Sequence, residues 1–174
     1  DGLEINYSVH FAQADDGRIW VVSGHAGCGI NVYMPDPARP GGHGTWSQFP
    51  WQPDTHTPLI QTSIRRASDG TLWIGGFGYL ATIRNDSLKV YGMFRSFSGD
   101  MPWHRLRLQE SSDGGMWVLG LGQHAARLSE AHHDALTLTG LSYQCRTPSG
   151  VEWFISRDRH AVAHQEGQWT RYAT

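Results

Sequence analysis

Five arginines are the residues of this sequence best suited to bind a charged ligand. A guanidinium group presents a planar fork of N–H donors that matches the oxygens of a carboxylate or a phosphate. All five fall in short segments with the alternating pattern of β-strands, at Arg65, Arg66, Arg105, Arg107 and Arg146. This pattern predicts a site for an anion, centred on Arg65 and Arg107. The alternative is that the arginines pair with acidic residues of neighbouring elements.

Two tryptophans add candidate contacts for a sugar or a peptide. Trp51 and Trp103 each lie in a long connector, over residues 49–58 and 97–104. Both connectors join equivalent predicted strands, so they should emerge on the same face, where exposed aromatic side chains are candidate anchors. The alternative is that the two rings pack over the edges of the fold.

The histidines and cysteines lack the spacing of a metal or catalytic site, although the chain has 10 histidines and 2 cysteines. His160 and His164 are four residues apart, which separates them by about 13 Å along a strand. No nucleophile elbow, phosphate-binding loop or paired-cysteine motif occurs, and Cys28 and Cys145 are expected to be free thiols. We therefore predict no catalytic residue, no metal and no cofactor. A lyase or hydrolase that uses a loop-borne histidine stays open as an alternative.

The elements that must position these residues are repeats. Four segments share a turn, a glycine and a tryptophan three residues after that glycine, at residues 16–20, 69–73, 113–117 and 149–153. An alternating segment precedes each turn, and two further strand-like segments follow each tryptophan. Each repeat therefore predicts four short antiparallel strands joined by tight turns.

Four antiparallel strands in about 40 residues form the pattern of a β-propeller blade. The predicted blades span residues 8–51, 59–94, 104–139 and 141–174, and residues 1–7 predict a spare outer strand. We predict an all-β propeller of four blades, as one domain over residues 1–174. It forms either a small closed ring or part of a larger propeller. The repeated tryptophan should pack between blades, and the arginine-bearing strands should line the central channel. Open blade edges predict pairing with a second copy of the chain.

Composition and charge exclude several classes of protein. Charged residues make up only 17% of the chain, and it contains 21 glycines and 8 tryptophans. These values argue against a disordered or coiled-coil chain. A net charge of -2 predicts no nucleic-acid partner. No apolar run is long enough for a membrane helix. The chain begins at Asp1 without an N-terminal apolar segment, so we expect a processed or excised chain.

The second repeat resembles the two-component regulator propeller repeat. The match runs from Ile64 through Asp69-Gly70 and Trp73-Ile74-Gly75-Gly76 to Ile83. The first and third repeats also match well, whereas the fourth departs from the pattern at Ser149, Glu152 and Ser156. The resemblance implies the seven-bladed propellers of bacterial sensor proteins, usually periplasmic, and no universal catalytic residues. Weaker resemblances exist to tectonin-type lectin repeats and, through residues 150–154, to streptogramin-lyase-like propellers.

The favoured function is a non-enzymatic sensory or recognition module. It would bind a small anionic or carbohydrate ligand, or a protein partner, at the axial mouth of the propeller. A lectin-like sugar-binding propeller is a further alternative, favoured by the number of tryptophans. The resemblance to bacterial sensors implies a periplasmic or extracellular location.

Overall fold

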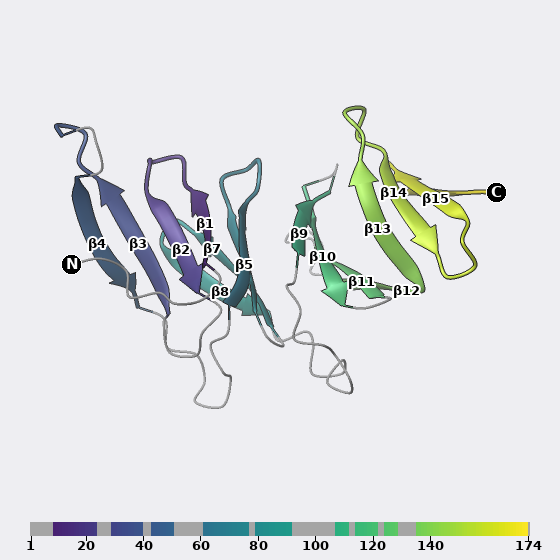
Figure 1. The fold of residues 1–174 in the computed structure, drawn as a ribbon, viewed down its shortest axis with the longest axis horizontal. Helices are drawn as coiled ribbons and strands as arrows, with labels where there is room; N and C mark the ends of the chain where they lie inside the picture. The colour runs from purple at the N-terminus through teal and green to yellow at the C-terminus, as the bar shows by residue number, and fades with distance from the viewer. Residues whose placement is uncertain are drawn as a thin grey trace. The chain divides into compact units, whose positions relative to one another are not determined.

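The computed structural model consists of antiparallel β-sheets. It describes residues 9–23, 29–39, 43–50, 61–76, 79–91, 107–111, 114–121, 124–128 and 135–173. Those residues contain sixteen strands in four sheets of four, and each strand pairs with the next strand of its own sheet (Figure 1). The four antiparallel strands predicted for each repeat are confirmed. The spare strand expected at residues 1–7 lies outside the described residues.

The chain divides into two compact units, Asp1–Gly99 and Asp100–Thr174, with two sheets in each unit. We number the sheets as blades 1 to 4 in chain order. Blade 1 consists of β1 (Val9–Gln13), β2 (Ile19–Ser23), β3 (Ile30–Pro35) and β4 (Gly44–Phe49). Blade 2 consists of β5 (Gln61–Arg66), β6 (Leu72–Gly76), β7 (Tyr79–Arg84) and β8 (Ser87–Tyr91). The single domain expected over residues 1–174 stays a prediction.

The second unit repeats this arrangement. Blade 3 consists of β9 (Arg107–Glu110), β10 (Met116–Leu121), β11 (His124–Leu128) and β12 (Ala135–Thr139). Blade 4 consists of β13 (Leu141–Arg146), β14 (Glu152–Ser156), β15 (Ala161–Gln165) and β16 (Gln168–Tyr172). In all four blades the first and the last strand are the two edges of the sheet. The arginine-bearing strands β5, β9 and β13 are therefore edge strands.

The turn-glycine signal works as expected in the first hairpin of each blade. In blade 2 the N–H of Gly70 donates to the carbonyl of Ala67 at 3.1 Å, and Asp69 accepts from the N–H of Thr71 at 3.0 Å. The motif glycines all have φ between +80° and +86°. A residue with a side chain is strained in this region. The Asp-Gly pair therefore determines where the strand reverses.

The core of the first unit lies between blades 1 and 2. Trp20, Val22, Ile30 and Val32 of blade 1 cluster with four apolar residues of blade 2, which are Leu72, Ile74, Ala81 and Ile83. All eight side chains are buried. Successive side chains point to opposite faces of a strand, and directly paired residues share a face. Trp20, paired with Ala12 and Val32, thus faces blade 2.

The core of the second unit has the same construction. Trp117 and Leu119 of blade 3 cluster with Phe154 and Val162 of blade 4. The rings of Trp117 and Phe154 meet edge to face, with centroids 5.2 Å apart. We call the side of a blade that bears the motif tryptophan its tryptophan face and the other side its back face. In both units, the tryptophan face of one blade packs on the back face of the next blade.

Candidate functional site

The two arginines predicted at the centre of the site, Arg65 and Arg107, are both exposed on edge strands. Arg65 pairs in register with Trp73 and Arg107 with Leu119, so each lies on the tryptophan face of its own blade. Neither guanidinium forms a hydrogen bond or an ion pair with a residue that the structure describes. Each arginine therefore has donors available for a ligand.

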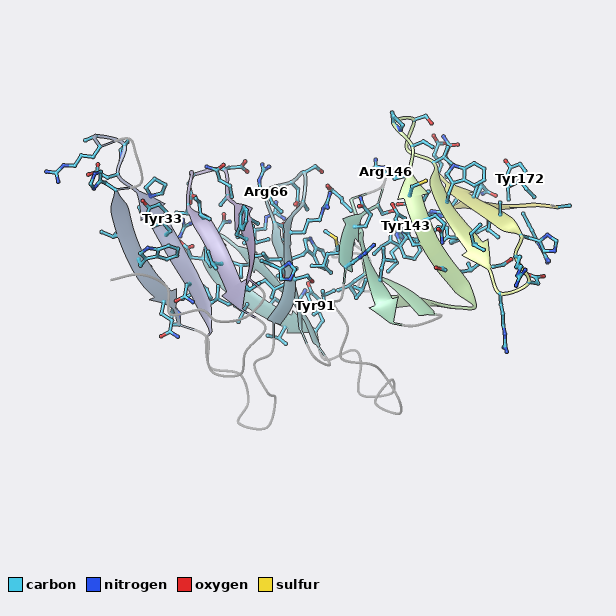
Figure 2. All side chains as sticks on the ribbon, viewed as in Figure 1. Tyr33, Arg66, Tyr91, Tyr143, Arg146 and Tyr172 are labelled. Atoms are coloured by element: carbon cyan, nitrogen blue, oxygen red, sulfur yellow. The ribbon has the colours of Figure 1, made fainter. Side chains whose placement is uncertain are left out.

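Two other arginines are used between blades. Arg66 lies on the back face of blade 2, next to Arg65 but on the opposite side, and forms an ion pair with Asp15 of blade 1. Arg146 has the equivalent place in blade 4 and donates to the backbone carbonyl of Glu110 in blade 3 at 3.3 Å. Figure 2 labels both arginines, each at the hairpin end of its strand. Arg66 thus makes the contact with an acidic side chain that the alternative interpretation expects, whereas the contact of Arg146 is with a backbone carbonyl.

The other predicted site residues, Arg105, Trp51 and Trp103, lie outside the described residues, as does Cys28. Cys145 is a free, exposed cysteine on β13. Within the described part of the chain, no group of histidine, cysteine and acidic residues has the geometry of a metal site. The described residues also contain no helix long and apolar enough to cross a membrane.

Two ion pairs of one arginine connect a hairpin of blade 1 with a hairpin of blade 2. Arg18 forms ion pairs with Asp16 of its own hairpin at 2.6 Å and with Asp86 of blade 2 at 2.7 Å. Partial burial acts to raise the pKa of the Asp16 carboxyl. Hydrogen bonds from the backbone N–H and the guanidinium of Arg18 outweigh that effect and hold this pKa below its usual value.

The lowered pKa of Asp16 predicts acid sensitivity of the first unit. An unfolded aspartate has a pKa of about 3.9, so below that pH the unfolded chain takes up protons that the folded chain still excludes. The contribution of Asp16 to stability is therefore complete above about pH 4 and is lost as the pH falls through the folded pKa. We expect Asp16→Asn to flatten the dependence of the urea midpoint on pH between about 5 and 3. Parallel profiles for the parent and the variant would contradict this prediction.

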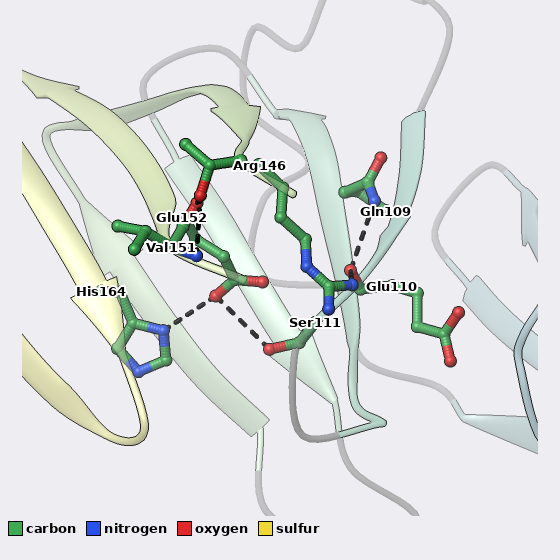
Figure 3. Close-up of polar contacts among 8 residues, drawn as sticks. Gln109, Glu110, Ser111, Arg146, Val151, Glu152 and His164 are labelled. Atoms are coloured by element: carbon green, nitrogen blue, oxygen red, sulfur yellow. Dashed lines mark hydrogen bonds and ion pairs between the residues drawn. The ribbon is translucent and has the colours of Figure 1, made fainter. Parts of the chain in front are cut away.

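The structure also reveals a buried polar group between blades 3 and 4, which we call the polar trio: Ser111, Glu152 and His164 (Figure 3). One carboxylate oxygen of Glu152, Oε2, lies 2.8 Å from Nδ1 of His164 and 3.4 Å from the hydroxyl of Ser111. Glu152 is fully buried, and His164 and Ser111 are 5% and 2% exposed. Glu152 and His164 pair across β14 and β15, whereas Ser111 follows β9 of blade 3.

The surroundings of the polar trio argue against catalysis by it. The imidazole of His164 is enclosed by the rings of Trp117 and Trp169, at centroid distances of 6.1 Å and 4.4 Å. The hydroxyl of Ser111 contacts the carboxylate of Glu152 rather than the imidazole of His164, so the serine–histidine contact that activates a nucleophilic serine is missing. Sequence reasoning missed this group, although Glu152 was noted as a departure from the repeat pattern. That departure was the available signal.

Comparisons with known proteins support the fold. No family model and no curated protein matches the sequence. Among solved structures, a catalytically inactive virginiamycin B lyase from Staphylococcus aureus with quinupristin has a TM-score of 0.62 at 15% identity, over 100% of this chain and 58% of its own. The extracellular domain of a one-component system from B. thetaiotaomicron also has a TM-score of 0.62, at 14% identity, over 97% of this chain and 24% of its own.

A third neighbour is the extracellular domain of a hybrid two-component system from B. thetaiotaomicron. Its TM-score is 0.54 at 15% identity, over 90% of this chain and 21% of its own. At these identities the likeness shows the fold alone, which is that of β-propeller blades. The chain spans less than two thirds of the length of each of these neighbours.

Proposed function

We propose that this chain is a recognition part of an extracellular or periplasmic sensor propeller, and that it binds a small carboxylate or phosphate ligand through its edge-strand arginines. The observation that carries the proposal is the contrast between adjacent residues. Arg66 forms an ion pair with Asp15, whereas Arg65 is exposed and its guanidinium forms no hydrogen bond or ion pair with the described residues.

The sensor role is supported by two of the structural neighbours, which are extracellular domains of signalling systems. The likeness to a lyase does not favour an enzyme here. The hydrogen-bonded Glu–His pair of the polar trio is enclosed between blades 3 and 4. A substrate therefore has no access to that pair in the folded chain. A recognition module needs no such access, because exposed guanidinium groups suffice for an anion.

The proposal is tested with a double variant, Arg65→Ala with Arg107→Ala. The probes are inorganic phosphate, succinate and an oligogalacturonate, titrated by calorimetry at low ionic strength. We expect at least one probe to bind the parent. Each lost charge-assisted hydrogen bond should weaken binding by about 1.5–3 kcal/mol, which is roughly ten- to a hundredfold. The thermal midpoint should stay close to that of the parent, because neither side chain bridges two blades.

The matched control is Arg66→Ala, one residue from Arg65 but on the opposite face. It should lower stability through the loss of the pair with Asp15 and leave the affinity for the anion unchanged. The proposal is wrong if no anion binds the parent, or if the double variant loses stability while Arg66→Ala loses affinity. Because the measurement follows binding directly, it does not depend on knowing the rest of the signalling protein.

A further inference from the structure

The polar trio occupies places that are apolar elsewhere in the repeat. The residue before each motif tryptophan lies on the back face of its blade; in chain order it is Ile19, Leu72, Met116 and Glu152. Its partner on the neighbouring strand is, in the same order, Tyr33, Ile83, Leu128 and His164. Only blade 4 has an acid and an imidazole at this pair of positions.

Ser111, the third residue of the polar trio, also stands where the first unit has an apolar residue, and it belongs to the opposing blade. The residue whose backbone N–H closes each first hairpin is, in chain order, Ala14, Ala67, Ser111 and Thr147. In the first unit, Ala14 packs against the cluster that contains Leu72 and Ile83. In the second unit, the same three places are held by Ser111, Glu152 and His164. The second unit thus has a hydrogen-bonded group at the three places where the first unit has Ala14, Leu72 and Ile83.

Stability alone does not account for this difference between the two units. Burying a carboxylate costs several kcal/mol unless hydrogen bonds and charges compensate it, and an apolar group of similar volume is often as stable or more stable. The first unit shows that the apolar solution fits this fold. The second carboxylate oxygen of Glu152, Oε1, is buried without a partner among the described residues, so the compensation is incomplete.

The contacts of the polar trio depend on which blade lies opposite. If blade 4 packed on a hairpin with alanine in place of Ser111, Glu152 would lose a hydrogen bond in a buried place. If a back face like that of blade 2 packed on blade 3, Leu72 would leave the hydroxyl of Ser111 without a partner. Both mismatches bury an unsatisfied polar group, which destabilises the mispaired arrangement. Repeats of similar structure are prone to mispairing during folding, within a chain or between copies.

We propose that Ser111, Glu152 and His164 determine which blades pair, by making the tryptophan face of blade 3 specific for the back face of blade 4. The residues act on assembly of the fold and not on the proposed ligand. They are specificity-determining positions, comparable to a buried polar pair that fixes register in a coiled coil.

The main test replaces the polar trio by the residues of the first unit, as S111A/E152L/H164I, beside the single variant Glu152→Leu. We expect the triple variant to melt at or above the parent temperature and the single variant to melt below it. After unfolding in urea and dilution, the parent should return to one species on size exclusion with light scattering. The triple variant should give a several-fold larger fraction of exchanged oligomers.

A milder variant covers the case in which the triple variant does not fold. Ser111→Ala removes only the contact between blades and leaves the Glu152–His164 pair intact. It should raise the oligomer fraction on refolding, whereas Ser142→Ala, at an exposed place on β13, should not. The proposal fails if the triple variant melts well below the parent, which would mean a stabilising role. It also fails if the refolded variants give the oligomer fraction of the parent.

Discussion

Replacing Trp117 by alanine will lower the free energy of unfolding of the second unit by about 3–5 kcal/mol. The indole is fully buried and contacts Phe154 and His164 of blade 4, so its removal leaves a cavity at the interface of two blades. Urea denaturation followed by far-UV circular dichroism measures the loss.

The matched control for this prediction is Trp153→Ala. Trp153 has the same place in the repeat motif but is only partly buried, and its ring contacts Tyr172 within its own blade at 5.4 Å. We expect a clearly smaller loss, because a less buried side chain leaves a smaller cavity. Equal losses for the two variants would show that the motif acts within a blade and not between blades.

Replacing Glu152 by alanine will lower the free energy of unfolding of the second unit by about 3–5 kcal/mol. The substitution leaves the buried imidazole of His164 without its 2.8 Å partner and removes the contact with Ser111. Glu152→Gln keeps the size of the side chain and replaces the carboxylate by an amide that can still hydrogen-bond, so the loss of stability should be smaller. Both losses are measured as shifts of the urea midpoint at pH 7.

Gln165→Ala serves as the control for the Glu152 variants. Gln165 lies next to His164 on β15 but is exposed, so its removal should change the midpoint little. If Glu152→Ala were as stable as the parent, the carboxylate of Glu152 would contribute nothing to the stability of the interface between blades 3 and 4. The account of a buried, mutually dependent group would then be wrong.

The local structure of the chain was predictable from its sequence. The turn glycines fix each first hairpin, because glycine alone adopts φ near +84° without strain, as at Gly17 and Gly70. The alternation of side chains then determines the strand registers, since a shift by one residue would expose Trp20. These features depend on residues that are close in sequence, so they can be predicted from the sequence of one chain.

The candidate site was predictable only in part. The sequence identified the arginines on edge strands but did not separate those that bind neighbours from those that remain free. Arg65 and Arg66 are adjacent in sequence and similar in chemistry. Only the register of β5 with β6 shows that Arg66 faces Asp15 of blade 1 and that Arg65 does not.

By itself, the sequence determined the repeat, the strands and the packing of Trp20 and Trp117 between blades, because turn chemistry and side-chain periodicity act locally. Tertiary structure alone decided which polar residues meet. Ser111 and Glu152 are 41 positions apart, and in the sequence Glu152 is only a departure from the repeat pattern. When blade 3 packs on blade 4, Glu152 becomes part of a hydrogen-bonded group. A buried carboxylate is tolerated only if the opposing face offers hydrogen-bond partners, and the sequence does not show which face lies opposite.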